Sequence, residues 1–203
     1  MKIFSALALS LTVLLGSYAH AETKQEEEPD TLVLSDSLNY DDITKVTQFR
    51  GNVILTRGLF RLSADNLDIT EDAEGFRHGK ATMNKGSKEL VKLIEENLED
   101  YEVIRAWGLV GEYNGKTEVV KMIGQAVVTR YVCGQPVDNV RGEQVIYDSK
   151  NKTYKAVGGP QSSEPGRVRS VVQPRSKADK ATEACRKKYN GKPMPSSIET
   201  PDI

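Results

Sequence analysis

The side chains that most often carry out catalysis are sparse in this sequence of 203 residues. Its two histidines are His20 and His78, and His78 lies between Arg77 and Gly79 in a polar stretch typical of a solvated loop. The motifs Gly-x-Ser-x-Gly and His-Glu-x-x-His do not occur, nor does a glycine-rich phosphate loop. Most aspartates and glutamates fall in predicted turns, where carboxylates cap backbone N–H groups. We therefore expect neither catalysis nor a cofactor.

The first 21 residues have the organisation of a signal peptide. Lys2 precedes the apolar run 3–15, and Ala19-His20-Ala21 is a small-x-small cleavage site. The alternative is a membrane anchor, but the run is shorter than the ~20 residues that a bilayer core requires. We expect cleavage after Ala21 and export to the periplasm.

The two cysteines of the chain are Cys133 and Cys185. An even number of cysteines in an oxidising compartment favours a disulfide. The alternative is a metal site, which needs more ligands than the sequence offers. We therefore predict a disulfide and no bound metal.

The formal net charge is −1, which argues against a nucleic-acid-binding protein. The two ends of the exported chain nevertheless differ in sign. Residues 22–30 form an acidic stretch, and we expect a disordered leader there. Residues 176–203 are expected to be a basic, flexible tail. The acidic residues of the first stretch are Glu22, Glu26, Glu27, Glu28 and Asp30, and basic residues towards the other end include Arg167, Arg169, Arg175, Lys177, Lys180, Arg186, Lys187 and Lys188.

Between these ends, a pattern of short β-strands repeats. Gly51-Asn52-Val53 recurs as Gly124-Gln125-Ala126, and the strand 62–69 recurs as 140–147. Gly58 lies where a tight turn would join the first two strands. Such an internal repeat indicates copies of one β-unit stacked on each other.

Three local patterns predict details of this stack. Leu67 falls on the opposite parity from Leu62, so we expect a bulge near Asp65-Asn66. Residues 87–100 fit a helix by spacing, but the flanking strands favour a strand over 90–94, with room for one helical turn at 97–100. Asn114-Gly115 predicts a two-residue hairpin turn.

The order of these motifs resembles the OstA-like family of lipopolysaccharide-transport proteins over about residues 30–175. The resemblance implies an all-β fold, an open, V-shaped antiparallel β-jellyroll over 31–175. The motifs that carry it are Leu38-x-Tyr40, Gly51-Asn52-Val53, Ala64-Asp65-x-Leu67-x-Ile69, Glu112-Tyr113, Gly124-Gln125-Ala126 and Gly142-Glu143-x-Val145-x-Tyr147.

The resemblance also implies a function. The jellyroll interior would shelter the acyl chains of lipopolysaccharide or lipooligosaccharide on their way from the inner to the outer membrane. Copies would join head to tail, with an LptC-like inner-membrane partner at the N-terminal edge and an LptD-like outer-membrane partner at the C-terminal edge.

The residues expected to line the lipid-binding groove are apolar or aromatic. Burial of acyl chains against such residues is worth roughly 0.8 kcal/mol per CH₂. Two alternatives remain open: a β-rich adaptor that joins envelope proteins through its edge strands while its interior is only a packed core, and, less favoured, a periplasmic hydrolase. The groove residues are Leu32, Leu34, Val53, Leu55, Leu62, Leu67, Ile69, Tyr113, Met122, Val128, Val145 and Tyr147.

Overall fold

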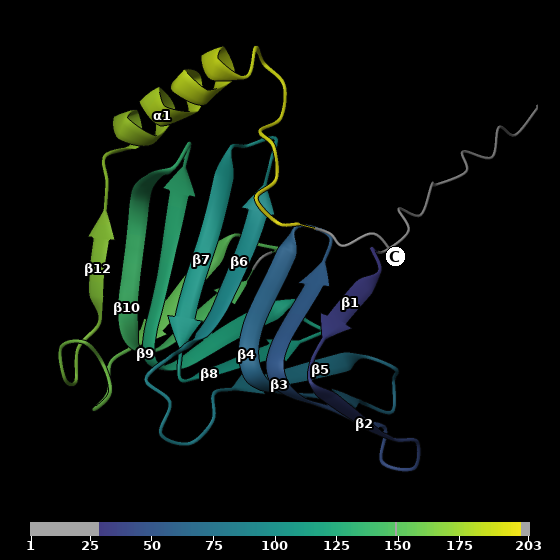
Figure 1. The fold of residues 1–203 in the computed structure, drawn as a ribbon. Coiled ribbons are helices and arrows are strands. Elements are labelled where there is room, and N and C mark those ends of the chain that lie inside the picture. The colour runs from purple at the N-terminus through teal and green to yellow at the C-terminus, as the bar shows by residue number, and fades with distance from the viewer. Residues whose placement is uncertain (1–28, 149, 200–203) are drawn as a thin grey trace, which may run out of the picture.

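The computed structural model describes residues 29–148 and 150–199 (Figure 1). Alternating apolar residues and glycine-containing turns produce antiparallel strands along most of this length, which confirms the predicted all-β class. The predicted signal peptide and most of the acidic leader lie outside the described residues. Within them, no helix is long and apolar enough to cross a membrane. The strands are β1 (Thr31–Leu34), β2 (Ser37–Asp41), β3 (Val46–Arg57), β4 (Phe60–Glu71), β5 (Arg77–Thr82), β6 (Val91–Asn97), β7 (Glu102–Gly108), β8 (Val110–Asn114), β9 (Val119–Val132), β10 (Gln135–Asp148), β11 (Thr153–Val157) and β12 (Arg169–Val172).

Four long strands, β3, β4, β9 and β10, each take part in two half-sheets. Their first set of neighbours gives sheet I, in the order β2-β3-β4-β5-β8-β9-β10-β11. Their second set gives sheet II, in the order β1-β3-β4-β6-β7-β9-β10-β12. All pairings are antiparallel. Figure 1 shows β4, β6, β7 and β10 upright in sheet II, with β2, β5 and β8 running across below them.

The long strands pass from one sheet to the other at two related β-bulges. In β3, Gly51 and Asn52 have φ of 76° and 48° and lie where the register with β4 shifts. In β9, Gly124 and Gln125 have φ of 70° and 51° at the equivalent shift against β10. A bulge bends a strand and increases its twist. The predicted repeat is therefore a repeat of this bend.

The hydrogen bonds around the two bends repeat as well. The N–H of Asp36 donates to the carbonyl of Gly51 at 3.0 Å, and the N–H of Leu109 donates to the carbonyl of Gly124 at 2.9 Å. The expected irregularity does fall opposite Asp65, although the extra residue belongs to β3 and not to β4.

Two local predictions can be compared with the structure. The prediction of a strand over 90–94 is confirmed, because β6 covers Val91–Asn97 and a turn follows it. The two-residue turn at Asn114-Gly115 is wrong: β9 begins only at Val119. The side chain of Asn114 accepts the N–H groups of Lys116 and Thr117, which stabilises a longer turn.

The C-terminal region also differs from the expectation of a flexible tail. Arg175–Lys188 form helix α1, which buries Ala181 and Cys185. Cys185 forms the predicted disulfide with Cys133, which lies in the β9–β10 turn, across a sequence separation of 52 residues. The segment is too polar to fold alone, but the disulfide and a small apolar contact with Val132 and Val137 hold it on the sheet.

Candidate functional site

The faces of sheets I and II that point toward each other share one apolar cluster. Ten of the twelve predicted groove residues belong to it. Met122 and Val145 are among its most buried members, with 1% and 0% of their surfaces exposed. The described interior is thus a packed core and not an open channel. The seven buried residues are Val53, Leu62, Leu67, Met122, Val128, Val145 and Tyr147, and the three partly buried ones are Leu55, Ile69 and Tyr113.

The two predicted residues of β1 lie elsewhere. Leu32 and Leu34 pair with Thr56 and Ile54, whereas Val33, between them, pairs with Leu55 and packs against the core. Successive side chains of a strand point to opposite faces, so an error of one residue reverses the assignment. The inward placement of Leu32 and Leu34 was wrong, and Val33 takes that position.

The inner face of sheet II changes from apolar to polar along its strands. Near the bends, one cross-strand row contains Leu93, Ala106 and Val128, all of them buried. Two residues further from the bends, the parallel row contains Glu95, Ile104, Arg130 and Asp138. The interior is therefore amphipathic, with its polar end at the turns that lie far from the bends. We call that end the mouth.

A cavity of about 450 Å³ lies at the mouth. Residues of both sheets line it, together with Pro193 from the C-terminal segment. Its volume falls within the usual range of ~300–1,000 Å³ for small-ligand sites, and its lining mixes carboxylates with apolar groups. The lining residues are Leu59, Glu95, Glu96, Asn97, Leu98, Glu99, Glu102, Ile104, Tyr147, Lys152 and Pro193.

Charged groups at the mouth are partly desolvated. The Arg130 guanidinium donates to Glu102 at 2.5 Å and to Asp138 at 2.8 Å, and all three side chains are less than one-third exposed. Burial raises the pKa of Glu95, which faces the same region. Burial likewise raises the pKa values of Tyr147 and Tyr154, whose rings stack at 4.9 Å between centroids.

One ion pair crosses the mouth between the two sheets. Nζ of Lys152, in the β10–β11 turn of sheet I, lies 3.1 Å from Oδ2 of Asp100, in the β6–β7 turn of sheet II. The amide of Asn97 donates to the same carboxylate oxygen at 2.8 Å. Both charged side chains are more than half exposed, so this contact is weak and readily exchanged for water.

The C-terminal segment runs beside the mouth after α1. Tyr189 stacks on Tyr101 at 6.2 Å, and the N–H of Met194 donates to the carbonyl of Leu98 at 3.0 Å. The Glu96 carboxylate then accepts hydrogen bonds from both serines of Ser196-Ser197. This segment covers the ends of β6 and β7 and supplies the hydrogen bonds that the buried Glu96 carboxylate needs.

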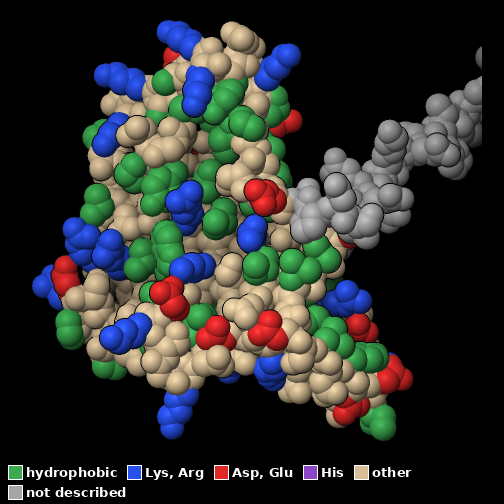
Figure 2. All heavy atoms as spheres, viewed as in Figure 1, with side chains coloured by type: hydrophobic (Ala, Val, Ile, Leu, Met, Phe, Trp, Pro, Cys, Tyr) green, Lys and Arg blue, Asp and Glu red, His purple; other side chains and the backbone are tan. Residues whose placement is uncertain are grey.

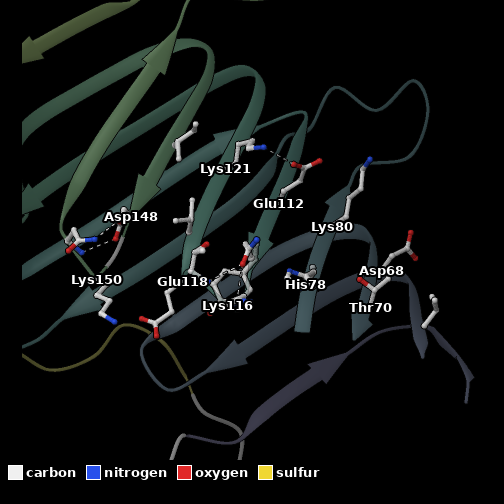
Figure 3. A pocket seen from close by; sticks show the side chains of 18 of the residues that line it. Asp68, Thr70, His78, Lys80, Glu112, Lys116, Glu118, Lys121, Asp148 and Lys150 are labelled. Atoms are coloured by element: carbon white, nitrogen blue, oxygen red, sulfur yellow. Dashed lines mark hydrogen bonds and ion pairs between the residues drawn. The ribbon is translucent and has the colours of Figure 1, made fainter. Parts of the chain in front are cut away.

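A larger concavity, of about 1,070 Å³, lies on the opposite, outer face of sheet I (Figure 3). Most of its lining residues have polar or charged side chains, and several of the charges are paired. Lys121 lies 3.4 Å from Glu112, and Lys116 lies 2.7 Å from Glu74. His78 also lines it, and its Nε2 lies 2.8 Å from Asp72. This arrangement suits hydrated polar groups and not acyl chains.

Sequence reasoning missed the contribution of β6 and β7 to the interior. The alternation Val91-x-Leu93 was visible, but its overlap with a helical spacing hid it. The alternation Ile104-x-Ala106 was also available as a signal. The charged residues of the mouth had no such signal, because Arg130 and Glu102 are 28 residues apart and meet only through the pairing of β7 with β9.

Comparisons with known proteins agree with this architecture. Residues 32–153 match the family described as LptA/(LptD N-terminal domain) LPS transport protein. Over 175 residues, the chain is 27% identical to the lipopolysaccharide export system protein LptH of Pseudomonas aeruginosa, covering 85% of this chain and 95% of LptH.

A solved structure extends the comparison to three dimensions. It is the crystal structure of LptH from Pseudomonas aeruginosa, described as the LptA-homologous periplasmic component of the conserved lipopolysaccharide transport device. The fold matches it with a TM-score of 0.61 and 26% identity, over 72% of this chain and 96% of that one. Since the family model covers more than half of the sequence, the chain belongs to the LptA/LptD N-terminal domain family of LPS transport proteins.

Proposed function

We propose that this protein carries lipopolysaccharide, or lipooligosaccharide, through the periplasm by sheltering its acyl chains between sheets I and II. The observation that carries the proposal is the gradient inside the jellyroll, from the apolar row of Leu93, Ala106 and Val128 to the polar row of Glu95, Arg130 and Asp138. An amphipathic lipid fits such a gradient with its chains toward the bends and its headgroup at the mouth.

Loading then requires the two sheets to separate. The interior is packed, with Val53 and Met122 only 1% exposed, so acyl chains must replace side-chain contacts between the sheets. Each buried CH₂ contributes roughly 0.8 kcal/mol, and several chains offset the lost packing. The exposed Lys152–Asp100 pair is the contact across the mouth that has to break. No catalytic step takes part.

The same protein would form part of a bridge through its sheet edges. β2 and β12 are fully exposed strands at opposite edges of the stack, and Leu38 and Val172 are 61% and 72% exposed. Each sheet has eight antiparallel members, so the first strand of one copy continues the last strand of another in antiparallel order. Free edges of this kind favour strand addition.

The free edges and the family membership support a proposal for the partners. An LptC-like inner-membrane protein would occupy the β1–β2 edge, an LptD-like outer-membrane protein would occupy the β11–β12 edge, and further copies would fill the distance between them. The signal peptide at residues 1–21 would bring the chain to the periplasm.

The test is saturable binding of the exported protein to labelled lipopolysaccharide, with deacylated glycolipid as competitor. We expect the deacylated competitor to fail to displace the label, because the acyl chains supply the affinity. A protein with an intact β-type circular dichroism spectrum that binds no lipopolysaccharide would instead be an adaptor, which the exposed edge strands favour as the second candidate.

A further inference from the structure

Helix α1 carries an unbalanced positive charge at the C-terminal edge of sheet II. Its residues Arg175–Lys188 include six basic and two acidic side chains, a net charge of +4. Figure 2 shows these blue side chains gathered over the helix at the top of the molecule. Glu183 pairs with Arg186 and Lys187. Arg175, Lys177 and Lys180 are exposed and have no ion pair within the residues that the structure describes.

These three cations lie in the first two turns of α1, where basic residues are unfavourable. The partial positive charge of a helix N-terminus favours acidic side chains there, but the first turn of α1 has none. Pro174, the residue before the helix, provides no side-chain cap. Among residues 29–148 and 150–199 of one copy, this surface therefore has no electrostatic complement.

The complementary charge occurs in the same chain, just before β1. Residues 22–30 contain five acids and Lys24, a net charge of −4. The leader joins β1, and α1 joins β12, at the end of each strand that lies near the mouth. Thr31 of β1 pairs with Arg57 beside the β3–β4 turn, and Val172 of β12 pairs with Asp138 near the β9–β10 turn. Leader and helix thus leave sheet II on the same side.

Within one copy, β1, which follows the leader, and β12, which precedes α1, lie at opposite edges of sheet II. Seven strand spacings of ~4.8 Å separate β1 from β12 by roughly 34 Å. Nine fully extended residues reach only about 30 Å. Between copies joined edge to edge, the separation falls to about one strand spacing, because β1 of one copy would lie beside β12 of the next.

We infer that the acidic leader of one copy, residues 22–30, binds the surface formed by Arg175, Lys177 and Lys180 on α1 of the preceding copy. This inference rests on the head-to-tail strand pairing proposed above. It adds an electrostatic clamp that sets the direction of stacking, because the acidic end of one copy meets the basic end of the next. The disulfide Cys133–Cys185 holds α1 in place for this contact.

The test is the self-association constant of the exported protein, measured by sedimentation at low and high salt. We expect the double variant Lys177→Glu/Lys180→Glu to weaken association roughly ten-fold at low salt, with little effect at high salt. Glu26→Lys/Glu27→Lys should weaken it by a similar factor. Combining the four substitutions should restore association to within about two-fold of the original, because opposite charges again meet.

A matched control reverses two exposed lysines outside this surface. Lys85→Glu/Lys88→Glu changes the net charge by the same amount as the α1 variant, but these residues lie in the loop between β5 and β6. We expect it to leave association unchanged. The clamp would be overturned if the control variant weakened association equally. It would also be overturned if the variant with all four substitutions associated no better than either double variant.

A third variant separates failure of the clamp from failure of the proposed bridge. The N–H of Gln173 donates to Val137 of β10, so by strand alternation Ser170 directs its N–H outward. Ser170→Pro removes that outward donor without removing a bond to β10. If it abolishes association while the charge variants have no effect, only the clamp is wrong. If it has no effect, or if the original protein stays monomeric, the edge pairing and the clamp are both overturned.

Discussion

Lys152 and Asp100 connect the tips of sheets I and II by an ion pair of 3.1 Å across the mouth of the jellyroll. Behind this pair, Glu95 and Tyr147 line a cavity of about 450 Å³, and the apolar interior begins. The contact joins two turns that are 52 positions apart in the sequence. In the proposed carrier role, these two turns must separate first for lipid to enter.

Holding these two turns together should therefore block loading. We expect Asp100→Cys/Lys152→Cys, joined by a short bismaleimide, to lose most of its uptake of labelled lipopolysaccharide, because the sheets cannot separate there. Uptake is measured by fluorescence after mixing. Each single cysteine variant treated with the same reagent serves as the control and should load normally. Full uptake by the cross-linked protein would show that lipid enters elsewhere.

The bend at Gly51 should be intolerant of a side chain. A Cβ added there would lie 2.1 Å from Oδ2 of Asp36, and φ is 76°. Gly51→Ala should lower the free energy of unfolding by about 2–3 kcal/mol, since strain and a steric clash add together. Gly134→Ala has a similar φ of 72° with nothing within 4 Å, and should cost only about 1 kcal/mol. Equal losses in urea denaturation would contradict the role of the close approach to Asp36.

Removal of the disulfide should release α1 without unfolding the jellyroll. The helix buries only Ala181 and Cys185, and a helix of 14 residues is marginal by itself. In Cys185→Ser, we expect amides of residues 178–188 to lose hydrogen-exchange protection while β9 and β10 keep theirs. Ala184→Ser, on the exposed side of α1, is the control. Unchanged protection in Cys185→Ser would mean that packing alone holds the helix.

Glu95 should make stability depend on pH. Burial raises the pKa of its carboxyl in the folded protein, so the folded state binds the proton more tightly than the unfolded state. Its effect is absent below the ordinary glutamate pKa of about 4.3, and the destabilisation grows as pH rises from there through the raised folded-state pKa. At pH 7, Glu95→Gln should therefore raise the free energy of unfolding and the melting temperature, because the variant buries no charge at this position.

At pH 4 the same variant should melt at the temperature of the original protein, because both carry a neutral side chain at position 95. Glu99→Gln removes a charge from an exposed position in the turn that follows β6 and serves as the control. A gain of equal size at both pH values would assign the effect of Glu95→Gln to packing and not to ionisation.

The sequence by itself determined the class of this fold and most of its interior. Alternating apolar residues predict strands, and the repeated Gly51-Asn52 and Gly124-Gln125 motifs mark the two bends, because each motif begins with a glycine, which adopts positive φ without steric cost. Ten of the twelve residues chosen for the groove lie in one cluster for the same reason. These features depend on local patterns that a single strand carries.

Tertiary structure decided the rest. Which face of β1 points inward depends on its register with β3. A shift of one residue would direct Leu34 inward in place of Val33. The polar mouth exists only because β6, β7, β9 and β10 align Glu95, Arg130 and Asp138 in one row. Helix α1 is held by the disulfide and by its packing against residues at the β9–β10 turn. Each of these depends on contacts between segments distant in the chain, which no local pattern encodes.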